Sequence, residues 1–237
     1  MKRYIFVISA VFVLIGGCKR QHPSVITIDP DFDSATVMTV LIVPTISAIT
    51  TGDDPTRQSE ILVDRVFWEF INERNDYVFI SPNTFRGAIG RHGLSTSIEK
   101  FRLDWMGSKV INDEFGEAIR SLNPDMVIIL EVYLWNKDEA DYRESATASA
   151  TQVGMTLSMV DPGSGLIMWE ATDENYREAI RTEGDRIQNT SGGFDRRIAG
   201  RSVSGKDVFA APPFEDVVVL VVEALVNAIP EKVATGK

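Results

Sequence analysis

Few side chains in this sequence are of the kinds that bind metals or attack substrates. The chain of 237 residues has one cysteine, Cys18, and two histidines, His22 and His92. A zinc site needs three or four Cys, His or carboxylate ligands held together, and the histidines lie far apart with no Cys or His at ligand spacing around them. One cysteine cannot form a disulfide within the chain. We therefore expect neither a metal site nor an internal disulfide.

The spacing of Gly200, Gly205 and Lys206 in GRSVSGK matches a phosphate-binding loop. In such a loop a Ser or Thr after the lysine binds magnesium, and the loop joins a strand to a helix whose N–H groups face the phosphate. Here Asp207 follows the lysine, no strand pattern precedes the loop, and a Pro-Pro pair follows shortly after. Glu131 ends an apolar run, as an acidic partner strand would, but many strands do so. We expect no nucleotide and no other cofactor.

The residue types of other catalytic sites are present without their spacing. No G-x-S-x-G nucleophile motif occurs, and Ser164 stands between two glycines in DPGSG, which favours a turn. The acidic stretch 29–33 resembles the start of a calcium loop, but it has Ser34 where glycine is needed and Val40 where glutamate is needed. These patterns predict a protein that is not an enzyme.

Hydrophobic patterning predicts the strands that would carry any site. Apolar, β-branched runs at 37–43, 77–80 and 126–135 are typical of buried strands. Apolar residues alternate with Gly, Thr and Ser over 153–159, which predicts a half-buried strand. The turn at 161–165 then favours a hairpin with 166–171 as its second strand.

Helical periodicity fills the segments between these strands. Asp54 can cap a helix over 55–74 with Pro55 at its first position. Further helices are expected at 82–88, 112–122 and 214–229, with a weaker pattern around 98–106. The sequence therefore predicts an α/β (α+β) fold: a mixed sheet of about five strands covered by helices, in the order β-α-β-α-α-β-β-β-α.

The N-terminus has the layout of a secretory signal. Two cations precede an apolar segment at 4–15, which as a helix reaches about 18 Å, short of the roughly 30 Å of a bilayer core. Ile15-Gly16-Gly17-Cys18 ends this segment and resembles the lipobox of bacterial lipoproteins. The resemblance implies cleavage between Gly17 and Cys18, a lipid on the Cys18 sulfur, and an acyl chain such as palmitate on the new amine. Lys19, where an Asp would favour the inner membrane, implies the outer membrane.

These features divide the chain into a signal peptide at 1–17, a lipidated tether at 18–35 and one periplasmic domain at 36–230 with a polar insertion at 173–213. The formal net charge of −10 disfavours nucleic acid as a partner. The insertion, however, carries a cluster of cations that could contact an acidic partner or an anionic envelope polymer. The candidates are Arg186, Arg196, Arg197, Arg201 and Lys206.

The strands VLIVP, YVFISP and MVIILEV, with the hairpin LSMVDPGSGLIMWEA, resemble the curli-secretion-type lipoprotein superfamily. That group includes the N-terminal domain of the Tol translocation protein and the penicillin-binding-protein activator lipoproteins. The resemblance covers about 37–171 and 214–229, and its most specific part is Asp161, Ser164-Gly165 and Trp169 in the hairpin. It implies a protein that binds envelope partners, and it permits a homo-oligomer.

We therefore expect an outer-membrane lipoprotein that faces the periplasm, is held to the membrane by its lipid, and acts as a non-catalytic binding, assembly or accessory module of an envelope complex. Two alternatives remain open at this point: a subunit of an oligomeric ring in secretion or export, and a periplasmic hydrolase.

Overall fold

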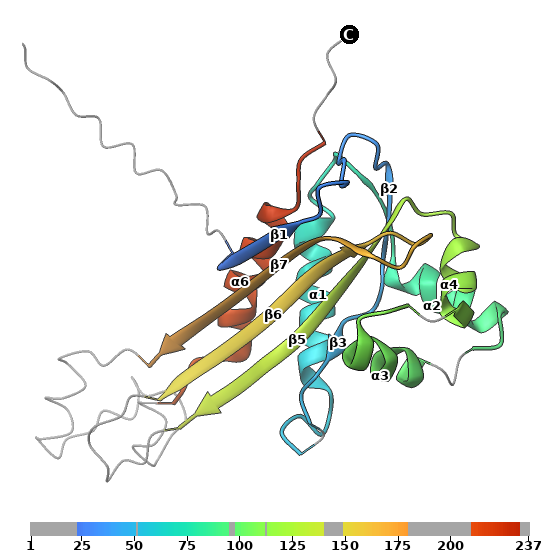
Figure 1. Cartoon of the computed structure of the whole chain (residues 1–237). Coiled ribbons are helices and arrows are strands. Elements are labelled where there is room, and N and C mark those ends of the chain that lie inside the picture. Colours follow the sequence, from blue (N-terminus) through green and yellow to red (C-terminus); the bar gives the residue numbers. More distant parts are fainter. Residues whose placement is uncertain are drawn as a thin grey trace, which may run out of the picture.

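The computed structural model describes residues 23–50, 52–94, 98–111, 113–139, 149–179 and 210–232. A seven-stranded mixed sheet forms its centre (Figure 1). The spatial order is β1-β7-β6-β5-β2-β4, with β3 also paired to β5. β2 runs parallel to β4 and β5, whereas β5, β6, β7 and β1 are antiparallel to one another in turn. The strands are β1 (Val25–Ile28), β2 (Thr39–Ile42), β3 (Ile46–Ser47), β4 (Val78–Ile80), β5 (Met126–Asp138), β6 (Ala150–Val160) and β7 (Ile167–Glu178).

Helices cover both faces of this sheet (Figure 1). α1 (Gln58–Ile71) and α6 (Phe214–Ala228) pack on one face, and α2 (Pro82–Arg91), α3 (Ile98–Ser108) and α4 (Asp113–Arg120) pack on the other. The predicted class, a mixed sheet covered by helices, is confirmed. The sheet has seven strands instead of about five. The weaker helical pattern around 98–106 forms a full helix, α3, so three helices join β4 to β5 where the expected order had two.

The apolar strands are buried on both faces, which explains their continuous hydrophobic sequence. In β2, Val40 and Ile42 belong to the core beneath α1 and α6, while Leu41 belongs to the core beneath α2–α4. In the alternating strand β6 the apolar residues share one face, as predicted, and that face packs beneath α1 and α6. On its other face Ser158 donates to Glu170 of β7 at 2.9 Å.

Two short strands were absent from the expected order. β1 lies within residues 18–35, for which the sequence predicted a tether. The structure corrects this prediction for Val25–Ile28, which pair antiparallel with β7. The backbone N and the Oγ of Ser24 also donate to Asp173 Oδ1, at 3.1 and 3.0 Å. The four residues VITI, between Pro23 and Asp29, are too few to give a periodic signal, and their partner strand is distant in sequence. β3 has only two residues, too few for any pattern.

Two predicted boundaries also shift. β7 continues to Glu178, so residues 173–178 of the predicted insertion belong to the sheet. α1 begins at Gln58 and not at Pro55, because Arg57 adopts a left-handed conformation with φ of 50° immediately before it. Asp54 still caps the helix, but from one turn upstream: its carboxylate accepts from the N–H groups of Gln58 and Ser59 at 2.8 and 2.9 Å.

Gly154 of β6 accommodates an aromatic ring from the neighbouring strand. A Cβ at this position would lie 2.6 Å from Cζ of Tyr133, which stands at the irregular pairing between Val132 and Leu134 of β5. We expect Gly154→Ala to displace the Tyr133 ring and to lower the free energy of unfolding by about 1–2 kcal/mol. Denaturant unfolding monitored by circular dichroism measures this change.

A second glycine of the chain provides a control for Gly154→Ala. Gly107, inside α3, has no atom near its missing Cβ, so Gly107→Ala should raise stability by about 0.5–1 kcal/mol. In a Tyr133→Ala background the cost of Gly154→Ala should largely disappear, since no ring is left to displace. An unchanged cost in that background would show that Tyr133 is not its cause.

Candidate functional site

The site residues expected from the sequence fall outside the part of the chain that the structure describes. This applies to the predicted cleavage and lipid-attachment residues and to the cationic cluster of the insertion: Gly17, Cys18, Arg186, Arg196, Arg197, Arg201 and Lys206. Those assignments therefore stay predictions. Among the described helices, none combines the length and apolar character needed to cross a bilayer.

The main cleft of the described residues lies where the chain reverses its direction of winding. From β2 the chain passes through α1 to β4 on one side, and it then returns through α2–α4 to β5 on the other side of β2. Ligands of open α/β sheets bind at such a switch point, beyond the carboxyl ends of the parallel strands. Here a cleft of about 810 Å³ opens beyond β3, between the 48–58 loop and the distal half of β5.

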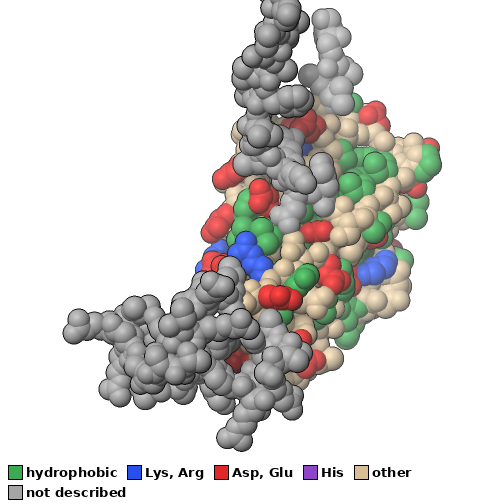
Figure 2. All heavy atoms as spheres, turned by 90° about the vertical axis from the view of Figure 1, so that its left-hand side faces the viewer, with side chains coloured by type: hydrophobic (Ala, Val, Ile, Leu, Met, Phe, Trp, Pro, Cys, Tyr) green, Lys and Arg blue, Asp and Glu red, His purple; other side chains and the backbone are tan. Residues whose placement is uncertain are grey.

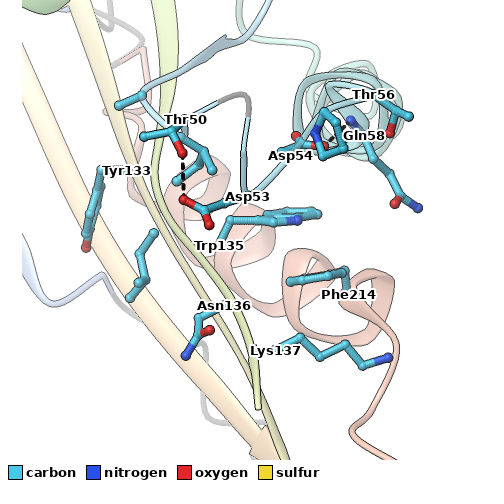
Figure 3. Close-up of a pocket in the computed structure, with 14 residues that line it drawn as sticks. Thr50, Asp53, Asp54, Thr56, Gln58, Tyr133, Trp135, Asn136, Lys137 and Phe214 are labelled. Carbon is cyan, nitrogen blue, oxygen red and sulfur yellow. Dashed lines mark hydrogen bonds between the residues drawn. The ribbon is translucent and has the colours of Figure 1, made fainter. Parts of the chain in front are cut away.

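An aromatic pair forms one wall of this cleft (Figure 3). The rings of Trp135 on β5 and Phe214 at the start of α6 stack with their centroids 4.0 Å apart and an interplanar angle of 9°. Trp135 lies opposite Val153 of β6 and is only 9% exposed, so β-sheet pairing and helix packing both fix its ring. This wall is rigid and apolar, as in many small-ligand and peptide sites.

Polar side chains surround the aromatic wall (Figure 3). Asp53 accepts a hydrogen bond from Thr50 Oγ1 at 2.6 Å, and Lys137 lies 3.6 Å from Glu139 as an ion pair. Gln58 and Asn136 add amide groups to the lining. An apolar wall with carboxylate, ammonium and amide groups around it suits a partner that has both polar and apolar parts.

The N-terminus of α1 borders the cleft but is not an anion site. Both oxygens of Asp54 accept from the first N–H groups of the helix, and Ser59 Oγ donates to Asp54 Oδ2 and lies 3.1 Å from Ser47 Oγ. A protein carboxylate therefore already occupies the place that a phosphate would take. Asp54 is 7% exposed and is committed to this structural role.

A second group of charged side chains lies at the end of β2, beside a smaller cavity of about 100 Å³. Arg57 donates to Glu99 at 2.8 Å, Arg102 also binds Glu99, and Arg102 donates to the Ser47 carbonyl at 3.1 Å. Burial raises the pKa of Glu60, while the hydrogen bond from Arg57 lowers that of Glu99. Two cations balanced by two carboxylates indicate a network that holds α3 against the sheet.

The remaining sequence candidates have structural roles. Glu131 accepts from Trp105 Nε1 at 3.2 Å and from Lys109, so it is not a free acidic partner for a phosphate loop. The backbone N and Oγ of Ser164 both donate to Asp161 Oδ2, which confirms Ser164 as a turn residue. No group of three or more His, Cys, Asp or Glu side chains in the described ranges is placed to hold a metal ion.

Asp173 of β7 is a buried carboxylate that the sequence did not indicate. It is 4% exposed, and its Oδ2 has no hydrogen-bond partner, although Oδ1 accepts from Ser24. Burial raises the pKa of Asp173 above its ordinary value, against the opposing effect of the bonds from Ser24. A raised pKa in the folded state means that its contribution to stability is greatest at low pH and is lost as the pH rises through the raised pKa.

We therefore expect Asp173→Asn to increase the free energy of unfolding at neutral pH, because the amide carries no buried charge. The gain should shrink as the pH falls and vanish below about pH 4, where the native side chain is itself neutral. Urea unfolding across this pH range measures it. Glu178→Gln, at the exposed end of the same strand, is the control and should show no such trend. A gain independent of pH would contradict the assignment.

Comparisons with known proteins find similar solved structures but no matching family. The chain matches no family model and no curated protein. Among solved structures it is similar to lipoprotein GNA1162 from Neisseria meningitidis, with 14% identity and a TM-score of 0.36 over 65% of this chain and 94% of that one. It is also similar to a PelC dodecamer from Paraburkholderia phytofirmans, with 13% identity and a TM-score of 0.40 over 85% and 92% of the two chains.

The C-terminal domain of LpoB from Salmonella enterica is a further similar structure, with 12% identity and a TM-score of 0.31 over 62% of this chain and 87% of that one. A bacterial lipoprotein and an oligomer are thus among the similar structures. With TM-scores below 0.5, these likenesses carry no argument about the function of this chain, which has to come from its own residues.

Proposed function

We propose that this chain is an outer-membrane-anchored periplasmic lipoprotein whose domain is a non-catalytic binding or assembly module of an envelope complex. The observation that carries the proposal is the cleft at the switch point of the sheet, where Trp135 and Phe214 form a fixed apolar wall beside Asp53 and Lys137. Such a surface binds a partner through packing, hydrogen bonds and charge. The lining as described offers groups for packing, hydrogen bonding and ion pairing, which suits association.

The N-terminal sequence supplies the other part of the proposal. Ile15-Gly16-Gly17 before Cys18 favours processing and lipidation at Cys18, and two or more acyl chains give stable anchoring, since each buried CH₂ contributes about 0.8 kcal/mol. Confinement to a membrane surface raises the local concentration of the domain, so that weak contacts in the cleft suffice for function.

Two measurements on the native protein test the two parts separately. Mass spectrometry of protein extracted from membranes should find Cys18 as the first residue, carrying acyl chains. A photo-crosslinking amino acid placed at the exposed Asn136 of the cleft should join the protein to a defined envelope component. The same amino acid at the exposed Leu103 of α3 is the control. Equal capture from both positions would argue against the cleft as the binding site.

A further inference from the structure

The edge strand β1 is unusually apolar for a solvent-exposed element. Its four residues are all exposed, with Val25 at 57%, Ile26 at 45% and Ile28 at 55% of their surface accessible. Of the twelve large hydrophobic side chains that the described residues expose, three thus fall in one four-residue strand. Edge strands normally carry charges or prolines that discourage association, and within Val25–Ile28 there is neither.

The outer edge of β1 pairs with no strand among the residues that the structure describes. The strand pairs with β7 on its inner side, and it ends the order of strands in the sheet. Figure 2 shows the side of the molecule on which β1 begins: hydrophobic side chains reach this surface among acidic ones, with few basic side chains between them. A surface of this kind needs a partner that accepts apolar side chains from a strand edge.

The length of chain before β1 identifies that partner. Ser24 is fixed to β7 through its two hydrogen bonds to Asp173 Oδ1. Only six residue steps separate Ser24 from Cys18, and a fully extended chain of that length reaches at most about 20 Å. If the acyl chains on Cys18 are in a bilayer, the beginning of β1 cannot be farther than this from the lipid surface.

We propose that the β1 edge of the sheet rests on the lipid surface, with Val25, Ile26 and Ile28 in the interfacial region of the bilayer. This inference rests on the proposed lipidation of Cys18. Lys19 and Arg20, which lie between the lipid and the strand in the sequence, add attraction to anionic headgroups.

Acidic side chains set the tilt of this edge. Asp29 follows the end of β1, and Glu170 of β7 lies opposite Thr27 in the pairing register. Both are expected to stay among water and headgroups, so the Val25 end of the strand approaches the lipid most closely.

Contact of β1 with the bilayer also limits the distance of the Trp135 cleft from the bilayer surface. In the order β1-β7-β6-β5, strand β5 is three strand spacings from β1, a distance of about 14 Å. The cleft on β5 therefore stays near the membrane, and a partner bound there is itself close to the bilayer.

The test uses the full lipidated chain in vesicles of phosphatidylethanolamine with a minority of phosphatidylglycerol. Because lipid blocks the Cys18 thiol, Ile26→Cys provides one free thiol for an environment-sensitive fluorophore. The matched control is Val78→Cys on β4, the opposite edge strand, where the side chain is 63% exposed. We expect the label at position 26 to shift to the blue and brighten severalfold on vesicles, while the label at position 78 stays unchanged.

Two controls make the outcome decisive. A lipidated protein whose label at position 26 stays unshifted on vesicles overturns this inference and leaves the proposed anchoring intact, whereas an unmodified Cys18 in mass spectrometry overturns both. The second control is lipid-free protein carrying Cys18→Ser. If its label at position 26 shifts as the protein concentration rises, the edge pairs with a second copy of the chain and not with lipid, which also overturns the inference.

Discussion

Replacing Arg74 with alanine is expected to lower the free energy of unfolding by about 2–4 kcal/mol. Arg74 follows α1, and its side chain is only 14% exposed. Its guanidinium donates to the carbonyls of Val226 and Ile229 at 2.8 and 2.9 Å and to that of Pro230 at 3.2 Å. These carbonyls lie at and just beyond the end of α6, where a helix leaves carbonyls without full partners. That of Val226 also accepts from the N–H of Ile229 at 3.3 Å, and that of Pro230 from the Tyr77 hydroxyl at 2.6 Å. The substitution removes three hydrogen bonds from a charged donor in a partly buried place.

The same guanidinium pairs with Asp76 through two nitrogens. Burial of this carboxyl opposes its ionisation, but the hydrogen bonds and charge of Arg74 outweigh that effect, so the pKa of Asp76 lies below its ordinary value. A lowered pKa contributes stability above the ordinary pKa that is lost as the pH falls through the folded pKa. The cost of Arg74→Ala should therefore be greatest at neutral pH and smaller in acid.

Arg65 provides a matched comparison, since it also joins the α1 region to α6. It pairs with Glu215 at 2.9 Å, but the two side chains are 56% and 60% exposed. Surface pairs of this kind contribute at most about 1 kcal/mol. Thermal and urea unfolding of Arg65→Ala should thus differ little from the parent chain. If the two arginine substitutions cost the same, the carbonyl contacts of Arg74 do not stabilise the fold.

Asp54→Ala should have an effect of similar size, about 2–3 kcal/mol. The carboxylate accepts from the N–H groups of Gln58 and Ser59, which otherwise have no partner at the start of α1, and from Ser59 Oγ. Asp54 and Ser59 are buried, and the bond from Gln58 is partly buried, so water cannot fully replace the lost acceptor. Asp54→Asn keeps one carbonyl oxygen and should fall between alanine and the parent chain. Urea unfolding measures all three proteins.

Substitution of Asp53, which precedes Asp54, tests binding with little effect on stability. Asp53 is exposed and accepts from Thr50, so Asp53→Ala should change the free energy of unfolding by less than about 0.5 kcal/mol. In the crosslinking experiment at Asn136, however, Asp53→Ala should reduce capture, because Asp53 lines the cleft. Loss of capture with Asp54→Ala alone would instead mean that the loop conformation, and not the cleft chemistry, is what the partner needs.

Contact of β1 with lipid and binding of a partner in the Trp135 cleft support each other. The short connection from Cys18 to Ser24 holds the sheet edge near the bilayer, and the strand order holds the cleft close to that edge. A partner that is also membrane-associated then meets the cleft in two dimensions, where a modest intrinsic affinity is enough.

Much of the architecture could be predicted from local patterns. Val40–Ile42 and 126–135 read as strands because they are buried on both faces, and the alternation over 153–159 gave the correct inward set of β6. The DPGSG turn predicted the β6–β7 hairpin, since Asp161, Ser164 and Gly165 have the conformations and hydrogen bonds that a tight turn requires. Each of these patterns involves residues that are close in the sequence, so it could be recognised without knowledge of the tertiary structure.

The cleft, in contrast, could not be derived from the sequence. Asp53, Trp135 and Phe214 come from three distant segments. The strand order around β2 places Asp53 near β5, and the packing of α6 on the sheet brings Phe214 onto Trp135. Asp173 and Ser24 likewise meet only because β1 adds to the far edge of the sheet, 149 residues away in the chain.

What the sequence determined by itself is whatever depends on neighbours along the chain: the lipobox-like segment ending at Cys18, the periodicity of helices and strands, and the turn at 161–165. What only the tertiary structure decided is whatever depends on pairing between distant strands: the membership of Val25–Ile28 in the sheet, the position of the cleft and the burial of Asp173. Local patterns report burial and backbone preference, whereas register and strand order follow from packing free energy summed over the whole domain.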